Sequence, residues 1–371
     1  MTATSSVFQR LILPGFALKA VVIGGGYATG REIAEFFVPA GPQGGLYAMA
    51  VATVLFSLIC IVTFLYARWS GSTDYRAFMR HLLGPFWGVC EVAYILMYIL
   101  ILAVYGAAAG AIGEAMFGWP TLAGVLALMA AIAAFTAFGN ASVEWLYQYA
   151  SYFLDGVYAL YVIFTLSQFG GQTAATLATV SKAEDWLTAG FTYTNYNVVG
   201  AVAILPVLRH LTSTKDAVIA GALAGPLTMI AALLFFLCML AWYPQIGAEA
   251  LPADFMLRRL GMPVLHGAFQ LMIFSALVLS SVSTVHAINE RIAGWLAERG
   301  GRGFPPAKRF ASTTVLLVIA IFFAQRFGLV DLIAKGYRGL AILFLVVFVA
   351  PVMTFGLWRL VSAGRSKSAT T

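Results

Sequence analysis

Long runs of apolar residues follow one another along the chain, separated by short breaks that contain polar residues, glycine or proline. A helix that crosses the hydrocarbon core of a bilayer needs about 20 mostly apolar residues, and the breaks leave ten runs of about that length or longer. The pattern therefore predicts an all-α integral membrane protein with ten transmembrane helices. They cover 10–38, 44–68, 84–117, 120–138, 142–169, 186–209, 216–243, 263–292, 308–325 and 328–361.

Composition supports this prediction, because 61% of the residues are hydrophobic, 10% are charged and the mean hydropathy is +0.89. A water-soluble globule usually carries about 25% charged residues. Soluble enzymes, nucleic-acid-binding proteins and secreted disulfide scaffolds are therefore excluded. Cys60, Cys90 and Cys238 lie in apolar runs without metal-binding spacing. We also find no motif of an intramembrane enzyme and expect no enzymatic activity or organic cofactor.

Lysine and arginine are distributed unevenly between alternate loops, with fourteen on one predicted side and four on the other. Positive residues in short loops remain on the cytoplasmic side, so both termini are predicted to be cytoplasmic. The net charge of +7 then reflects orientation in the lipid bilayer and not a nucleic-acid partner. The predicted segments are a cytoplasmic N-terminal stretch (1–9), a first five-helix repeat (10–170), an extracellular loop (171–185), a second repeat (186–361) and a disordered cytoplasmic tail (362–371).

Two of the predicted helices carry interruptions. Helix 1 contains four glycines in the seven residues 24–30, and Arg31 and Glu32 follow at once. Helix 6 contains the polar stretch 192–200. Glycine costs a helix about 1 kcal/mol relative to alanine, so discontinuous helices 1 and 6 are expected. Because the interruptions lie five helices apart, they predict two inverted repeats, an arrangement typical of a transporter with a central site. The alternative for helix 1 is close helix packing through Gly26 and Gly30.

The segment from Gly24 to Phe37, GGGYATGREIAEFF, resembles the first-helix signature of the YkvI-like bacterial membrane proteins. These proteins are placed with the amino acid–polyamine–organocation superfamily and its LeuT-like fold. The resemblance implies a 5+5 inverted repeat in a bacterial inner membrane and secondary transport of a small amino acid or amine-containing solute. A receptor of the same fold, which binds an amino acid without moving it, is the alternative.

A helix interrupted in the membrane exposes amides on one half and carbonyls on the other. The amides near 28–30 are predicted to bind an anionic group such as a carboxylate, and the carbonyls near 22–25 to face a cation. A zwitterionic or amine-containing solute suits both ends. The predicted substrate-binding residues are Gly26, Tyr27, Ala28, Thr29, Gly30, Tyr105, Thr194, Asn195 and Asn197.

The coupling ion has two candidates. Ser280, Ser283 and Thr284 reproduce the hydroxyl spacing of the LeuT-like sodium site, in which carbonyls of helix 1, here near Val22 and Ile23, also take part. Hydroxyls in membrane helices otherwise bond their own i−4 carbonyls and bind nothing. The rival is proton coupling or exchange through a Lys19–Asp155 pair, since charges at membrane depth normally pair or titrate. A purely structural ion pair is the third possibility.

An extracellular gate is predicted between Arg31, just after the first interruption, and Asp331, the acidic residue of helix 10. The resemblance to LeuT-like transporters implies this pair. Two local pairings compete with it, because Asp331 and Lys335, and likewise Arg31 and Glu35, are spaced i,i+4 on one helix.

Overall fold

The computed structural model describes residues 6–138, 140–179, 182–298 and 304–368, and every regular element in these ranges is a helix. The first half contains α1 (Leu13–Val22), α2 (Gly25–Ala28), α3 (Arg31–Phe36), α4 (Pro42–Ser70), α5 (Tyr75–Leu83), α6 (Trp87–Phe117), α7 (Thr121–Phe138) and α8 (Asn140–Ala178). The second half contains α9 (Trp186–Asn197), α10 (Gly200–Ala203), α11 (Thr214–Met239), α12 (Pro252–Leu260), α13 (Pro263–Glu298), α14 (Pro306–Asp331), α15 (Arg338–Phe344) and α16 (Leu357–Ser368). Short 3₁₀ or π segments join these helices, namely η1 (Phe8–Ile12), η2 (Val38–Ala40), η3 (Gly84–Phe86), η4 (Leu205–His210), η5 (Leu240–Trp242), η6 (Gln245–Ala248), η7 (Leu332–Tyr337), η8 (Leu345–Val349) and η9 (Val352–Gly356).

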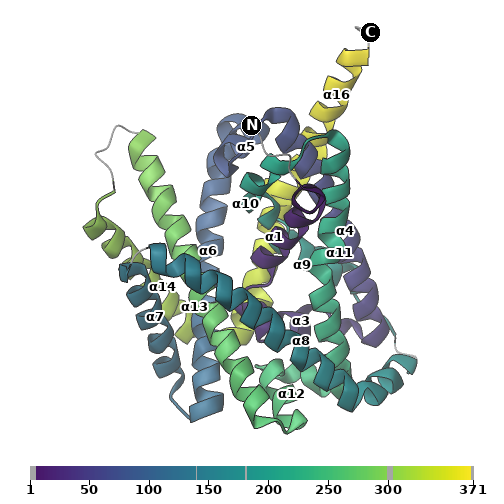
Figure 1. Ribbon diagram of the computed structural model, residues 1–371, viewed down its shortest axis with the longest axis vertical. Coiled ribbons are helices and arrows are strands. Elements are labelled where there is room, and N and C mark those ends of the chain that lie inside the picture. Colours follow the sequence, from purple (N-terminus) through teal and green to yellow (C-terminus); the bar gives the residue numbers. More distant parts are fainter. Residues whose placement is uncertain (1–5, 139, 180–181, 299–303, 369–371) are drawn as a thin grey trace.

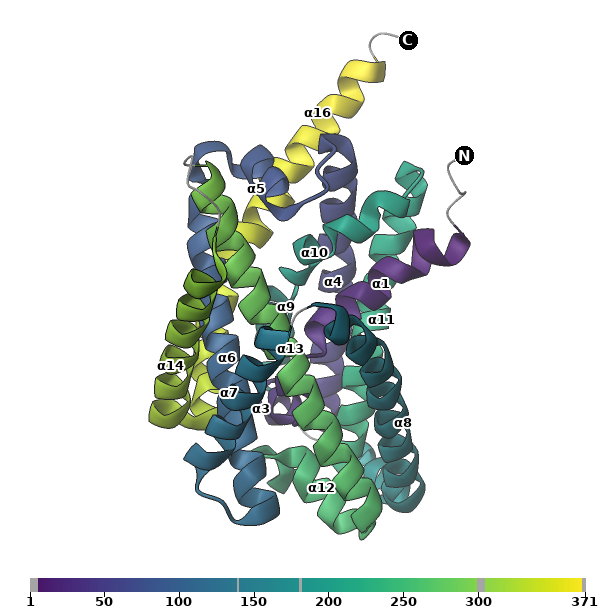
Figure 2. The same cartoon turned by 60° about the vertical axis from the view of Figure 1, so that its left-hand side comes forward.

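Six helical segments in the described ranges are long and apolar enough to cross a membrane. They are Pro42–Ser70, Tyr75–Phe117, Phe153–Ala178, Thr214–Trp242, Pro263–Ala297 and Ala307–Ala363. The last of these has 57 residues and is interrupted at Gly328, whose φ of 70° and ψ of 173° are not helical. In Figure 2, α14 runs down to this point and the yellow C-terminal helices run back up. The multi-pass membrane character predicted from the sequence is therefore confirmed.

The two ends of the chain lie at the same end of the molecule, together with α5, whereas α12 lies at the opposite end (Figures 1 and 2). The distribution of lysine and arginine predicts that α12 and the two termini lie on opposite sides, because Arg258 on α12 belongs to the smaller positive set.

Close contact between α4 and α11 forms the centre of the helix packing. A Cβ atom added to Gly221 would lie 2.6 Å from the Ile61 backbone, and one added to Gly225 would lie 2.2 Å from the Thr53 carbonyl oxygen. The hydroxyl of Ser57 donates a hydrogen bond of 2.8 Å across the same interface. Small residues let two helix backbones approach in this way, and van der Waals packing then holds them together in lipid.

We expect Gly225→Ala to lower the free energy of unfolding by about 1–3 kcal/mol, because the added methyl group must push α4 and α11 apart. Thermal unfolding in detergent, followed by intrinsic fluorescence, measures the change. Gly156→Ala on α8 is the matched control, since nothing lies within 4 Å of a Cβ atom there. Equal destabilisation by the two substitutions would contradict the packing described above.

Two predicted boundaries are wrong. The extracellular loop predicted over 171–185 begins later, because α8 continues to Ala178; residues 180 and 181 lie outside the described ranges. The tail predicted to be disordered from residue 362 is helical as far as Ser368, and residues 369–371 lie outside the description. Both stretches contain alanine and other residues that a helix accommodates, and neither contains proline.

Candidate functional site

The interruption of helix 1 consists of two short breaks around one helical turn. Helix α1 ends at Val22, Gly24 is extended (φ −92°, ψ −173°), and α2 follows. Gly30 then adopts the left-handed conformation with φ 80°, which glycine reaches without strain, and α3 begins. A Cβ atom on Gly30 would also lie 2.5 Å from the Phe235 ring. The prediction that all of 24–30 is non-helical is therefore wrong for residues 25–28.

The interruption of helix 6 is shorter still, and helix α9 continues to Asn197. Only Val198 and Val199 separate α9 from α10. Thr194 and Asn197 are helical, and their side chains bond carbonyls of their own helix, those of Gly190 at 2.8 Å and Tyr193 at 3.1 Å. The interruption predicted within 192–200 is therefore confined to Val198 and Val199.

The break at Gly24 faces α6 and α13. A Cβ atom added to Gly24 would lie 2.5 Å from the Tyr105 hydroxyl oxygen and 3.9 Å from Ser280 Oγ. Tyr105 is 8% exposed, so no room remains for a side chain at Gly24. The structure therefore brings the predicted residues Tyr105 and Ser280 together at the first interruption.

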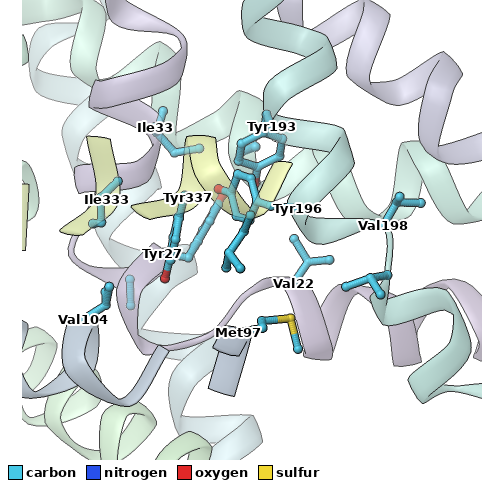
Figure 3. Packing of buried hydrophobic residues seen from close by; sticks show 14 of the residues in the cluster. Val22, Tyr27, Ile33, Met97, Val104, Tyr193, Tyr196, Val198, Ile333 and Tyr337 are labelled. Carbon is cyan, nitrogen blue, oxygen red and sulfur yellow. The ribbon is translucent and has the colours of Figure 1, made fainter. Parts of the chain in front are cut away.

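A second contact joins the two interrupted helices. Tyr196 on α9 donates a hydrogen bond of 2.7 Å to the Oε2 atom of Glu32 on α3, and both side chains are buried. The Tyr196 ring lies 4.7 Å from that of Tyr337 and 5.5 Å from that of Phe36. Figure 3 shows Tyr193, Tyr196 and Tyr337 gathered in this part of the core. We call Glu32 and the rings of Phe36, Tyr193, Tyr196 and Tyr337 the Glu32 centre.

Sequence reasoning missed Glu32 and Tyr196 as site residues. The signal for Glu32 was present, because an acidic residue inside a membrane helix marks a functional site by default. Tyr196 carries no comparable signal among the 16 tyrosines of the chain.

The amides predicted to hold an anion are occupied within the chain. Ala28 N–H donates to the Gly24 carbonyl at 3.3 Å, and Gly30 N–H donates to the Tyr27 carbonyl at 2.9 Å. The Thr29 hydroxyl accepts from Arg31 N–H at 3.2 Å. In this structure the turn of α2 therefore uses the donors that the predicted anion site at 28–30 would need.

The other predicted substrate-binding residues differ in what surrounds them. Tyr27 is 1% exposed, and its hydroxyl group has no hydrogen-bond partner among the described residues. Asn195 is buried on α9. The backbone of Gly26 belongs to α2, but its surroundings lie outside the described part of the chain.

The hydroxyl groups predicted to bind sodium are bonded to their own helix. Ser283 donates to the Leu279 carbonyl at 3.0 Å, and Thr284 donates to the Ser280 carbonyl at 2.8 Å. These are the i−4 bonds expected of any hydroxyl in a membrane helix. A hydroxyl that donates its hydrogen keeps its oxygen lone pairs, so a cation can still bind there. On helix 1, the Val22 carbonyl accepts from Gly24 N–H at 3.0 Å.

Lys19 and Asp155 form the ion pair expected from the sequence. Lys19 Nζ lies 3.2 Å from Asp155 Oδ1, which joins α1 to α8. The Asp155 side chain is 73% exposed and that of Lys19 is 22% exposed. The pair lies within one turn of the first interruption, because Ile23 N–H donates to the Lys19 carbonyl.

Arg31 and Asp331, the residues of the predicted gate, each pair with another residue in this structure. Arg31 instead contacts Glu35 on its own helix at 2.5 Å, and Asp331 pairs with Lys335 at 3.1 Å. Both competing i,i+4 pairings are therefore present, since each arginine or lysine finds its carboxylate one turn away. The link from α3 to helix 10 is made by Glu35, which lies 3.3 Å from Arg338.

The segment containing η6 and α12, at the end of the molecule away from the termini, is bound to the first interruption. Arg31 donates to the carbonyls of Gly247 at 2.8 Å and Glu249 at 2.9 Å. Ala253 N–H donates to the Thr29 carbonyl at 3.0 Å. Buried Arg31 therefore holds this segment as a lid on the interruption, and we call residues 245–260 the outer lid.

At the other end of the molecule, Glu91 lies between two arginines. It is 3.2 Å from Arg76 Nε and 2.7 Å from Arg291 Nη1, which joins α5, α6 and α13. Next to this ion-pair network, Tyr94 donates to the carbonyl of Val199 in the second interruption at 3.2 Å. The interruptions are thus held by an ion-pair network on each side.

Comparison with known proteins gives one relative and several structures. The chain is 22% identical over 282 residues to the uncharacterized membrane protein YkvI of Bacillus subtilis (strain 168), an alignment that covers 76% of this chain and 80% of YkvI. No protein-family model matches the chain. The relative confirms the resemblance predicted from residues 24–37.

Two solved structures are similar over most of the chain. MhsT in complex with L-phenylalanine has a TM-score of 0.60 at 15% identity and covers 92% of this chain and 88% of MhsT. The manganese transporter of Eremococcus coleocola has a TM-score of 0.58 at 15% identity and covers 91% of this chain and 77% of that transporter. Both have the LeuT-like fold, and at this identity the likeness establishes the fold alone.

Proposed function

We propose that this protein is a secondary active transporter that moves a small amine-bearing organic solute by alternating access. It crosses the membrane ten times in two inverted five-helix repeats, with helices 1 and 6 interrupted. The fold shared with two transporters supports this proposal. The distribution of positive residues favours a bacterial inner membrane with both termini in the cytoplasm.

The hydrogen bond between Tyr196 and Glu32 is the observation that carries the proposal. It connects the helix before the second interruption to the helix after the first one, in a buried position. In transporters built from inverted repeats, the solute binds between the repeats near the bilayer midplane. Direct contact between the interrupted helices therefore supports a solute site at the Glu32 centre.

The chemistry of this centre favours a cationic group on the solute. A buried carboxylate attracts an ammonium group, and tyrosine rings attract it through their faces. The amides that would have held a carboxylate are already bonded within the chain. We therefore favour an amine-containing solute over a zwitterion whose carboxylate lies at residues 28–30.

Sodium is the first candidate for the coupling ion. Its ligands would be the hydroxyls of Ser280, Ser283 and Thr284 and the carbonyls of Val22 and Ile23. The position of Ser280 next to Gly24 supports this arrangement, because it places α13 against the first interruption. Sodium at about 100 times its Kd would stabilise the folded protein by ~2.7 kcal/mol.

Replacing Ser283 and Thr284 together with alanine should abolish this sodium-induced stabilisation. The fold should survive, because both hydroxyls donate to carbonyls of their own helix, which keeps its backbone hydrogen bonds without them. Thermal unfolding in sodium chloride and in choline chloride measures the effect. Thr314→Ala is the control, since its exposed hydroxyl also bonds an i−4 carbonyl. An unchanged response to sodium in the double variant would exclude this site.

The second candidate is coupling to protons, or exchange, through Lys19 and Asp155. The 3.2 Å ion pair at the end of α1 favours it, because a charge pair near the first interruption can exchange protons during transport. Asp155→Asn should then stop uptake driven by a pH gradient and leave sodium-driven uptake unchanged. Normal transport by this variant would show that the Lys19–Asp155 pair has a structural role only.

Uptake of radiolabelled amines into proteoliposomes tests transport itself. The expected result is accumulation above protein-free liposomes under an imposed sodium or pH gradient. Binding of an amine without uptake under any gradient would instead identify a sensor of the same fold.

A further inference from the structure

Glu32 differs from the other buried or half-buried carboxylates of the central helices. Glu35 and Glu91 each form an ion pair with arginine. Glu32 is 4% exposed, and its one polar contact in the described part of the chain is the Tyr196 hydroxyl group. An isolated ionised carboxylate in such surroundings is costly, so the group either becomes neutral or acquires a cation.

Aromatic rings pack around Tyr196, the residue that donates a hydrogen bond to Glu32. The Tyr196 ring has its neighbours at 4.7 Å (Tyr337), 5.5 Å (Phe36) and 5.6 Å (Tyr193). Figure 3 shows the rings of Tyr193, Tyr196 and Tyr337 in this part of the core. The faces of aromatic rings favour a cationic group.

We propose that Glu32 binds the ammonium group of the transported solute, and that it holds a proton whenever the solute is absent. When the ammonium group arrives, the carboxyl proton leaves and the carboxylate oxygen accepts the N–H donor. One positive charge therefore replaces another, and the buried centre never holds an uncompensated charge. The inference rests on the proposed transport function and adds competition between solute and protons at one residue.

Other charged groups on the elements around Glu32 are engaged elsewhere. On α3, Arg31 and Glu35 bond each other, and on η7, Lys335 bonds Asp331. On α12, Asp254 is bonded by Arg258 and His266. The part of α11 that contacts Gly30 contributes the apolar side chains of Phe235 and Met239. Tyrosines are the remaining titratable neighbours, namely Tyr27 on α2, Tyr193 and Tyr196 on α9, and Tyr337 on η7.

Dicyclohexylcarbodiimide tests the protonated state without knowledge of the solute. The O–H of a neutral carboxyl group adds across one C=N bond of this reagent, and the acyl group then migrates to nitrogen to give a stable N-acylurea. Peptide mass spectrometry of the purified protein should find Glu32 labelled at acidic pH. Labelling should fall about tenfold per pH unit once the carboxyl group ionises.

Two variants control this experiment. Glu32→Gln should lose the label, and Glu35→Gln should keep the label on Glu32, because Glu35 is already paired with Arg31 and Arg338. Tyr196→Phe keeps the ring but removes the hydrogen bond to Glu32, so labelling should extend to higher pH. Absence of label on Glu32 at every pH, or labelling that does not change with pH, would overturn the proposal that Glu32 holds a proton.

Protection by amines tests the second half of the proposal. The probes are methylammonium, tetramethylammonium and putrescine, each compared with the neutral alcohol of similar shape. At least one ammonium probe should slow labelling of Glu32, and its alcohol should not. Equal effects of every ammonium probe and its alcohol would exclude ammonium binding at Glu32.

Release of protons into weakly buffered solution gives an independent measurement. An ammonium probe that protects Glu32 should release up to one proton per protein, and Glu32→Gln should release none. Uptake without labelling of Glu32 would remove this inference and keep the transport function. Labelling of Glu32 and its protection by an amine, without uptake, would keep amine binding at Glu32 and remove the transport function.

Discussion

Replacing Arg31 with methionine is expected to lower the free energy of unfolding by about 3–5 kcal/mol, as removal of one partner from a buried ion pair does. Arg31 is 5% exposed and binds both the Glu35 carboxylate and two carbonyls of the outer lid. Methionine keeps the length of the side chain but leaves those carbonyls and part of Glu35 without a donor. Thermal or chemical unfolding in detergent measures the loss.

The control is Asp331→Ala, which also tests the pairing of Asp331 with Lys335. Asp331 is 46% exposed and bonds Lys335 on its own helix, and such pairs contribute about 0.2–0.5 kcal/mol. This variant should therefore keep nearly full stability. Large and equal losses of stability from both substitutions would indicate that Arg31 pairs with Asp331. That result would contradict the two pairings seen in the structure.

Glu91→Gln, at the opposite end of the molecule, should also lower the free energy of unfolding by about 3–5 kcal/mol. Arg76 and Arg291 both pair with Glu91, and both would keep a half-buried charge without a carboxylate. Since Tyr94 joins this region to Val199, the loosened network should also expose the second interruption. A cysteine placed at Val199 should then react faster with a water-soluble maleimide.

Glu290→Gln is the matched control on α13, because Glu290 is 51% exposed and pairs with Arg309 near the surface. Exposed pairs of this kind contribute about 0–1 kcal/mol. Unchanged stability and unchanged cysteine reactivity in Glu91→Gln would contradict a role of the Glu91 network in closing that end.

Features that depend on hydrophobic length and charge distribution could be predicted from the sequence. The apolar runs predicted a helical multi-pass membrane protein, and segments such as Pro42–Ser70 confirm it. The glycines at 24–30 predicted an interruption, and Gly24 and Gly30 are indeed the non-helical positions. Lys19 and Asp155 were predicted as a pair because charges at membrane depth need partners, and they lie 3.2 Å apart.

Features that depend on competing local bonds could not be predicted in the same way. Thr194 and Asn197 looked like helix-breaking residues, but their side chains bond carbonyls one turn away and α9 continues. The sequence offered two acidic partners for Arg31, namely Asp331 and Glu35. In the structure, Arg31 pairs with Glu35 on its own helix. The Glu32–Tyr196 bond joins residues 164 positions apart, and no local pattern encodes that distance.

A structure of the protein in lipid nanodiscs, determined by electron microscopy with an amine that protects Glu32, would show directly whether the solute binds between the interrupted helices. We expect ten membrane-crossing segments and density for the amine between Glu32, Tyr196 and the break at Gly24. Density for the amine at a site away from both interrupted helices, with the Glu32–Tyr196 bond unchanged, would contradict this expectation.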